Sequence, residues 1–475
     1  MNLELHNHQI SLDRLEVTAE LFTIPLENNT YLIYAPLRRV AFIGNASCVN
    51  TLADLRQGCL TSPTRETLAF IDFLKQLEII DGEPEEVPVS EFAGHPTPTD
   101  VTLFLTTQCN LRCTYCYASA GDTPLRSMPL EVAKRGIDEI IANALQTKAD
   151  HIEVNYHGGG EPTVNWDTLY QSYDYARQLC EHHGLGLIAS LATNGVMSDK
   201  KRQWVIEHLD GVSISFDGLP QAHDLHRLTV SGQGSSHLVE TTLRALDEAN
   251  FPYGLRMTVT KDQIETLPQS VSYIFDHFNP QALQVEPAYQ LGRWKDQPSA
   301  ETASFIKAYR HAQYEAKTRG RDIQFSGARL GVLSPHFCGV TQDSFCLSTE
   351  GNVSACYEVF NQDQTFAERF FYGKPKNGQK GYEFNQHLVD DLRGQTVDQR
   401  AYCKGCFAKW SCGGDCLNKA LNVGKEEGFK GTDRCHIIRE LTKDQILHAI
   451  ASSETGYWNG KECISCNEEE SDYDL

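Results

Sequence analysis

Hydrophobic and amphipathic segments alternate along the middle of the chain. Six short apolar segments read as strands, and they begin at Val101, His151, Leu187, Gly211, Tyr253 and Ala282. The segments between them, such as those from Leu130 and Val239, have the period of an amphipathic helix. Buried strands that alternate with helices are typical of a parallel sheet built from βα units. Six units are two fewer than a closed barrel needs, so the pattern predicts an α/β fold with a partial (β/α)6 TIM-like barrel.

The first 95 residues follow another pattern. YLIYAPLRRVAFIG predicts two short strands, and ETLAFIDFLKQLEIIDG predicts an amphipathic helix and a turn, so this part is a small α+β unit. Together with the distribution of cysteines, the pattern predicts four units. They are residues 1–95 (α+β), 96–325 (barrel), 326–450 (cysteine-rich) and 451–475 (an acidic tail).

Composition narrows the class of protein. The chain has 475 residues, of which 40% are hydrophobic, and its net charge is −21. These values exclude wholesale disorder and disfavour binding to nucleic acid or to an anionic membrane. No run approaches the ~18 apolar residues of a membrane helix, and the first residues lack the basic and apolar regions of a secretory signal. We therefore expect a cytoplasmic protein with reduced cysteines.

Three of the 16 cysteines form a C-x3-C-x2-C motif directly after the first predicted strand: Cys109, Cys113 and Cys116. Three thiolates on one loop can hold three irons of a [4Fe–4S] cube and leave the fourth iron open to a ligand. The alternative is zinc, which takes four ligands, and His151 or His157 could supply the fourth.

Eight more cysteines lie in the last third of the chain, namely Cys338, Cys346, Cys356, Cys403, Cys406, Cys412, Cys416 and Cys435. They suffice for two sites of four thiolates, which suit either iron–sulfur clusters or zinc. Gly413 and Gly414 would let the backbone wrap closely around a cluster. Cys463 and Cys466 form a C-x2-C pair before the acidic end. The pair is either a redox dithiol, a loose metal site, a substrate-facing thiol or two inert cysteines.

Polar residues follow the predicted strands, at the edge where parallel β/α folds bind ligands. The second strand ends in HGGGEPT, whose glycines allow a close approach of the backbone to a ligand and whose Glu161 could bind an ammonium group. A plain tight turn is the alternative. Later strands end at Thr193–Gly195 and at Ser213, Ser215 and Asp217, followed by Arg227. Together they suit a zwitterionic amino acid with an attached ribose.

These motifs carry a resemblance. CNLRCTYCY, GGGEP, ATNG and SISFDG, in this order, resemble the radical S-adenosylmethionine (SAM) superfamily. The eight later cysteines resemble the SPASM extension, which holds two auxiliary clusters in peptide- and protein-modifying members. The resemblance covers residues 98 to about 440 and favours iron–sulfur clusters over zinc. The first 95 residues resemble the winged-helix-like, leader-peptide-binding domain of many peptide maturases, although a generic α+β cap over the barrel is nearly as well supported.

The resemblance implies cofactors and their contacts. It implies three [4Fe–4S] clusters, one binding SAM and two auxiliary. Cys109, Cys113 and Cys116 would hold the catalytic cluster, and SAM would contact Tyr115 (adenine), Gly159, Gly160 and Glu161 (amino group), Ser215 (ribose or carboxylate) and Arg227 (carboxylate). One auxiliary cluster would take Cys338, Cys346, Cys356 and Cys416, and the other Cys403, Cys406, Cys412 and Cys435.

The implied activity is reductive cleavage of SAM to a 5′-deoxyadenosyl radical, which abstracts hydrogen from a peptide carbon. We expect a thioether or carbon–carbon crosslink in a ribosomally synthesised precursor peptide, with flavodoxin or ferredoxin as electron donor. The alternatives are formylglycine formation of the anaerobic sulfatase-maturase kind, a non-catalytic zinc-ribbon scaffold and, less favoured by the acidity, RNA modification. No general base can be named from the sequence.

Overall fold

The six apolar segments form six parallel strands in the computed structural model, which describes residues 15–122, 124–423 and 431–460. Neighbours in sequence are neighbours in the sheet. The strands are β4 (Asp100–Phe104), β5 (His151–His157), β6 (Gly186–Thr193), β7 (Gly211–Ser215), β8 (Tyr253–Val259) and β9 (Ala282–Pro287). Because β9 and β4 do not pair, the barrel is open, which confirms the predicted partial (β/α)6 barrel.

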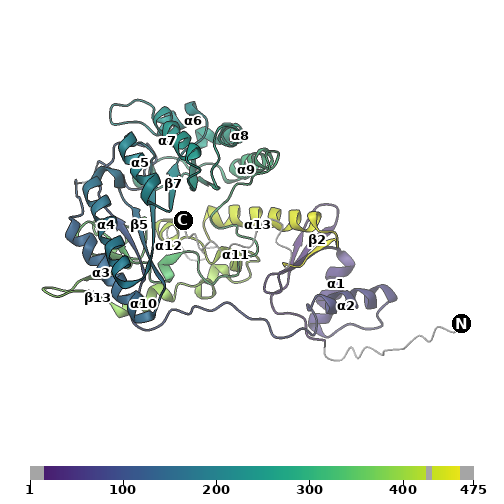
Figure 1. Ribbon diagram of the computed structural model, residues 1–475. Helices are drawn as coiled ribbons and strands as arrows, with labels where there is room; N and C mark the ends of the chain where they lie inside the picture. Colours follow the sequence, from purple (N-terminus) through teal and green to yellow (C-terminus); the bar gives the residue numbers. More distant parts are fainter. Residues whose placement is uncertain (1–14, 123, 424–430, 461–475) are drawn as a thin grey trace.

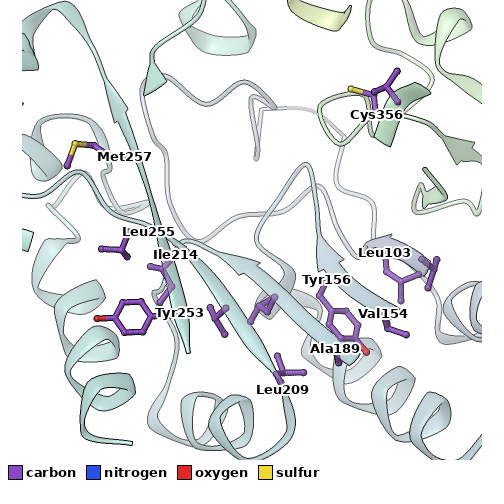
Figure 2. Packing of buried hydrophobic residues seen from close by; sticks show 14 of the residues in the cluster. Leu103, Val154, Tyr156, Ala189, Leu209, Ile214, Tyr253, Leu255, Met257 and Cys356 are labelled. Atoms are coloured by element: carbon purple, nitrogen blue, oxygen red, sulfur yellow. The ribbon is translucent and has the colours of Figure 1, made fainter. Parts of the chain in front are cut away.

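Helices cover the outer face of this sheet (Figure 1). They are α3 (Leu130–Thr147), α4 (Trp166–His183), α5 (Asp199–His208), α6 (Pro220–His226), α7 (Ser236–Glu248), α8 (Leu267–His277) and α9 (Thr302–Lys317). Every second strand residue packs into the core beneath them, as Leu103, Val154 and Leu255 do in Figure 2. Burial of each such side chain stabilises the fold by about 1.5–3 kcal/mol.

The opposite face of the strands points into the barrel, and much of it is polar. Asn155 on β5 accepts a hydrogen bond from the Ser190 hydroxyl on β6 (2.5 Å), and Ser215 on β7 pairs in register with Arg256 on β8. Strand alternation thus gives a dry outer core and a polar lumen.

The cysteine-rich part continues the barrel sheet. β10 (Cys346–Leu347) runs parallel to β4, with Cys346 opposite Thr102. β11 (Val353–Ser354), β12 (Phe371–Pro375) and β13 (Tyr382–Phe384) then follow antiparallel, which gives a ten-stranded sheet. The hydrophobic pattern did not predict these strands, because segments of two to five residues are too short to show a period.

From residue 15 on, the first domain has three antiparallel strands and two helices: β1 (Phe22–Pro25), β2 (Thr30–Ala35), β3 (Val40–Asn45), α1 (Ala46–Gln57) and α2 (Arg65–Gln76). The predicted strand pair and helix are confirmed, and β1 and α1 are additional. Asn45 caps the start of α1, where its side chain accepts from the Cys48 amide, and Gly58 caps its end in the left-handed conformation. Far along the chain, β14 (Tyr457–Trp458) adds to the edge of β3.

The long helix α13 (Asp433–Ser452) joins the two ends of the molecule (Figure 1). Its 20 residues span about 30 Å. Near its end, Ile446 and Ile450 pack against Leu32 and Tyr34 of the first domain, with Trp458 beside them. The helix therefore connects the cysteine-rich part, where it begins, to the N-terminal sheet.

A second contact joins the first domain directly to a cysteine loop. The Glu20 carboxylate accepts from the indole nitrogen of Trp410 (2.5 Å) and forms an ion pair with Lys409. Trp410 is 1% exposed and lies between Cys406 and Cys412 in sequence. The remaining helices of the cysteine-rich part are α10 (Gln386–Arg393), α11 (Lys409–Cys412) and α12 (Leu417–Val423).

The connection from the first domain to the barrel, residues 81–98, crosses the cysteine-rich part without a long regular element. The Gly94 carbonyl accepts from Arg393 (2.7 Å) and Gln386 (3.0 Å) of α10. The ten-stranded sheet and α13 run across the expected boundaries at residues 325 and 450, and the division into four units stays a prediction. Cys463 and Cys466 lie outside the described residues. No helix in the described ranges is long and apolar enough to cross a membrane.

Candidate functional site

The C-x3-C-x2-C loop leaves the carboxyl end of β4 and is pinned to the segment after α6. The Arg112 amide donates to the Leu228 carbonyl (2.6 Å), and the Thr114 amide donates to the His226 carbonyl (2.9 Å). These bonds fix the loop across one rim of the barrel, where the ends of the parallel strands meet.

The three thiols of this loop lie close together. Burial raises the pKa of Cys109 to about 12, and the charges of Glu161, Cys113 and Cys116 add to the shift. Burial also raises the pKa of Cys113 to about 11, against the lowering effect of Arg227. Three clustered, poorly solvated thiols repel one another as thiolates, so a cationic centre between them would be strongly favoured.

Glu161 joins the ends of the second and third barrel strands. It is 2% exposed, and its carboxylate accepts from the hydroxyls of Thr163 (2.8 Å) and Thr193 (2.7 Å) and from the Asn194 amide (2.8 Å). Burial raises its pKa, and these hydrogen bonds oppose the rise. Asn194 also donates to Asn110 (2.7 Å) beside Cys109. The motifs after β4, β5 and β6 therefore form one hydrogen-bonded rim.

The three glycines of HGGGEPT have three different surroundings. A Cβ on Gly158 would meet nothing closer than 3.5 Å, which is an ordinary contact. A Cβ on Gly160 would lie 2.1 Å from the Gln108 carbonyl oxygen, part of the backbone that leads into the cysteine loop. A Cβ on Gly159 would lie 2.2 Å from the ring of Phe360, four residues after Cys356. The cysteine-rich part thus lies directly against the glycine loop.

Tyr115 and Arg227, which the sequence singles out separately, share one buried carboxylate. Arg227 donates to both oxygens of Asp217 (3.0 and 3.3 Å), the Tyr115 hydroxyl donates to the same carboxylate, and the guanidinium lies over the Tyr115 ring. Burial opposes the charge of Asp217, but Arg227 holds its pKa below the ordinary value. Ser215 ends β7 two residues earlier, half-buried. Asp217 is therefore the residue that positions both expected contacts.

The later cysteines gather into two sets, which we call the first and second cysteine sets. Besides burial, the charges of Cys416 and Cys338 raise the pKa of Cys356, and the charge of Cys338 raises that of Cys346. Residues far apart in sequence are thus neighbours. The first set comprises Cys338, Cys346, Cys356 and Cys416.

The second cysteine set lies on the loop around α11 and at the start of α13. Burial raises the pKa of Cys403 to about 12, Arg400 opposes this, and Cys406 and Cys435 add to it. The pKa of Cys412 rises through burial and through Asp415, Cys435 and Cys403. The second set comprises Cys403, Cys406, Cys412 and Cys435. In the part of the chain that the structure describes, no three His, Cys, Asp or Glu residues are arranged to hold a single metal ion.

A buried ion-pair network lies between the two sets. The Arg434 guanidinium is 2% exposed and donates to Asp415 (2.7 Å), to Glu286 of β9 (2.6 Å) and to the Ser326 hydroxyl (2.9 Å). Asp415 precedes Cys416, and Arg434 precedes Cys435. The network therefore ties both sets to the barrel. No local pattern in the sequence could have identified it, because its members come from four separate segments.

Comparison with known proteins identifies relatives of the chain. The profile of the radical SAM superfamily matches residues 103–274. Mycofactocin maturase MftC of Mycolicibacterium smegmatis is 30% identical over 70% of this chain and 81% of that protein. The cysteine-type anaerobic sulfatase-maturating enzyme of Clostridium novyi is 23% identical over 70% of this chain and 90% of that enzyme. An uncharacterized protein of Methanocaldococcus jannaschii is 28% identical, and the chain spans 57% of its length.

Solved structures share the fold. Native anSMEcpe with bound AdoMet and Cp18Cys peptide superposes with a TM-score of 0.59 at 18% identity, covering 74% of this chain and 97% of that one. Streptococcus suis SuiB bound to precursor peptide SuiA superposes with a TM-score of 0.50 at 12% identity, covering 88% and 99%.

The contact between Gly159 and Phe360 leads to a testable prediction about the packing of the glycine loop against the cysteine-rich part. Gly159 does not have a positive φ, so the Phe360 ring is the main obstacle to an alanine there. We expect Gly159→Ala to speed amide hydrogen exchange of residues 157–165 by about 10- to 100-fold, since overpacking costs about 1–3 kcal/mol.

The double variant with Phe360→Ala separates this clash from a general defect. In free-energy terms, the double variant should change the exchange of residues 157–165 by less than the sum of the two single changes. The reason is that removal of the Phe360 ring leaves room for the alanine methyl group. Gly158→Ala serves as the matched control and should leave exchange unchanged. Gly160→Ala should be disruptive whatever stands at 360, because it meets backbone. Additive effects of Gly159→Ala and Phe360→Ala would contradict the contact.

Proposed function

The chain belongs to the radical SAM superfamily, and from this we propose that it is a maturase that forms a thioether or carbon–carbon crosslink in a ribosomally synthesised peptide. As a member it is an enzyme that uses SAM and [4Fe–4S] clusters, which replaces the zinc-ribbon alternative. The observation that carries the proposal is the small N-terminal domain, whose Glu20 accepts from Trp410 in the loop that bears the second cysteine set. A sulfatase motif can be modified without a leader-binding domain, whereas a leader-guided peptide requires one.

The catalytic cluster is assigned to Cys109, Cys113 and Cys116. Their mutual proximity and the cradle formed by the glycines support the assignment, since three thiolates leave one iron open. When bound, the cluster and SAM supply hydrogen-atom abstraction from an unactivated carbon. Within this chain, Glu161 would receive the SAM amino group beside Gly159 and Gly160.

The other expected SAM contacts depend on Asp217. Held by this carboxylate, Tyr115 would flank the adenine and Arg227 would bind the SAM carboxylate, with Ser215 at the ribose or carboxylate. Asp217 already occupies two of the Arg227 N–H groups, so a SAM carboxylate would use those that remain. The dry surroundings of this pair strengthen both interactions.

The two cysteine sets are proposed as the ligands of two auxiliary clusters. The first set would hold one cluster and the second set the other, with Cys416 joining the first set across the sequence of the second. The charge coupling of Cys416 to Cys356 and of Cys435 to Cys412 supports this grouping. With four thiolates per cluster, no iron is left open to a ligand, so these clusters would carry electrons or position the substrate. Flavodoxin or ferredoxin as electron donor, and a cytoplasmic location, stay predictions.

Iron analysis tests the cluster assignment. Anaerobically purified protein should contain about twelve irons and as many sulfides per chain, the content of three cubes. The variant with alanine at positions 109, 113 and 116 should retain about eight. Cys180→Ala is the matched control and should leave iron unchanged, since this buried cysteine lies on α4 and burial alone, with no charge of another cysteine, raises its pKa. Zinc without sulfide would contradict the assignment.

A leader peptide could join the N-terminal sheet as an added strand, a common mode of peptide binding. The sheet has two edges. On β1, the amides of Phe22, Ile24 and Leu26 face β2, so Thr23 and Pro25 face outward, and Pro25 has no N–H to donate. The β1 edge therefore offers little to a strand. On β3, β14 pairs with Ala41 and Phe42 only, and the next residue, Ile43, is 48% exposed. The β3 edge is thus the better site.

Substitutions at the two edges test leader binding. Ile43→Lys should weaken binding of a fluorescent leader peptide by about 10-fold or more, because it replaces an apolar contact worth about 1.5–3 kcal/mol. Thr23→Lys, at a residue that is also exposed, on the β1 edge, is the control and should change little. If only Thr23→Lys weakened leader binding, the leader site would lie at the β1 edge instead. No leader binding by the unaltered protein would exclude the leader-binding role.

Mass spectrometry of the co-expressed precursor peptide tests the reaction. A crosslink removes two hydrogens, so the mass should fall by ~2 Da per bond, and a joined pair of residues should resist fragmentation between them. Cys109→Ala should abolish the change. A peptide of unchanged mass would exclude the pairing of enzyme and peptide.

Formylglycine formation is the second candidate. The relationship to the anaerobic sulfatase-maturating enzyme over 90% of its length favours it. In this case the product would be an aldehyde, with a loss of ~18 Da at a cysteine or ~2 Da at a serine, and it would react with a hydroxylamine probe. A crosslinked product carries no aldehyde, so the probe separates the two reactions.

A further inference from the structure

Arg256 stands on the inner face of the barrel. On β8, Leu255 and Met257 are buried in the outer core, so Arg256 between them points the opposite way, into the lumen. Its strand neighbours are Ser215 on β7 and Gln284 on β9, which also face inward. Although β8 is an interior strand of the sheet, the Arg256 side chain is exposed.

The guanidinium of Arg256 has no partner of its own within the described ranges of the chain. No hydrogen bond or ion pair involves this side chain, whereas Arg227 and Arg434 are each paired with a buried aspartate. An unpaired arginine in a lumen is unusual in a chain with 63 acidic and 42 basic side chains. Arg256 is therefore available to a ligand without breaking an existing ion pair.

His157 locates the guanidinium of Arg256 between the cysteine loop and the first cysteine set. Burial first, and then the charge of Arg256, lower the pKa of His157 to about 4, although His157 stands across the lumen on β5. Beside His157, the hydroxyl of Tyr117, which directly follows Cys116, donates to the Gly158 carbonyl (3.3 Å). On the other side, the ring of Tyr357, which directly follows Cys356, has its centroid 5.5 Å from that of His157. The charged group of Arg256 thus acts on a residue that lies between the cysteine loop and the first cysteine set.

A carboxylate that acts on His157 is already neutralised by another cation. Glu358, two residues after Cys356, raises the pKa of His157 and so opposes the effect of Arg256. It forms an ion pair with Lys419 (3.1 Å) and accepts from Asn418 (2.8 Å). Because Lys419 holds Glu358, the positive charge of Arg256 remains uncompensated and would attract an anion.

We propose that Arg256 binds the carboxylate of a ligand in the barrel lumen. A guanidinium and a carboxylate form two parallel, charge-assisted hydrogen bonds, which fix the orientation of the ligand as well as hold it. The inference rests on the proposed function, in which two molecules carry a carboxylate: the peptide, at its C-terminus or an acidic side chain, and SAM. The peptide fits the position between the cysteine groups, whereas SAM would fit the neighbouring Ser215.

Binding measurements on the reconstituted holoenzyme separate the two ligands. We compare Arg256→Gln and Arg256→Lys with the unaltered enzyme, using SAM, the precursor peptide and a peptide whose carboxylates are converted to amides. If the peptide is the ligand, Arg256→Gln should weaken its binding by about 10- to 100-fold and remove the preference for free carboxylates. Arg256→Lys should lie between, because lysine keeps the charge without the bidentate geometry.

The remaining outcomes also decide. Weaker SAM binding with unchanged peptide binding would make SAM the source of the carboxylate. Arg177→Gln, in an exposed ion pair on α4, is the matched control and should change neither affinity. Unchanged iron content confirms that each variant has folded. If neither affinity changes more than twofold, the proposal is wrong. If the unaltered enzyme binds no peptide, the proposed function is wrong. The SAM affinities of the Arg256 variants then decide the role of Arg256.

Discussion

The buried pair of Arg434 and Asp415 is the constraint on which the rest of the molecule depends. Both side chains are 2% exposed, so each charge is tolerable only because the other is present. Arg434 also bonds to Glu286 on the last barrel strand, and it stands at the start of α13, which extends to the N-terminal sheet. Loss of one partner would leave an uncompensated buried charge, a cost of about 3–5 kcal/mol. One pair thus fixes the barrel, both cysteine sets and the first domain relative to one another.

The cysteine-rich part continues the sheet of the barrel. β10 pairs with β4, the strand that leads into the C-x3-C-x2-C loop, and this pairing sets Cys346 beside Thr102. From there the chain carries Phe360 onto Gly159. Spacing between the cysteine loop and the first cysteine set is therefore governed by backbone hydrogen bonds. Such a connection is stiffer than a linker, and it suits chemistry that requires fixed distances.

How much the sequence predicts depends on the range of each interaction. The six barrel strands have a local signature, a run of apolar residues between helical periods, and all six are found. The glycine loop and the C-x3-C-x2-C motif are equally local. By contrast, β10 to β13 are too short for a period, and the contacts of Asp217, Arg434 and Phe360 join segments whose proximity only folding creates. The grouping of Cys416 with Cys338 came from family resemblance, because sequence order places it inside the other set.

The strand β14 has a consequence for how the chain is made. Ala41 leaves the ribosome well before its strand partner Trp458, and synthesis at about 5–20 residues per second separates them by tens of seconds. During this time Leu32 and Tyr34 lack the helix α13 that covers them. The N-terminal domain is thus synthesised before the barrel and completed only after it. Its apolar face is exposed to chaperones throughout translation, and the sheet closes only after all eleven cysteines of the three groups have emerged.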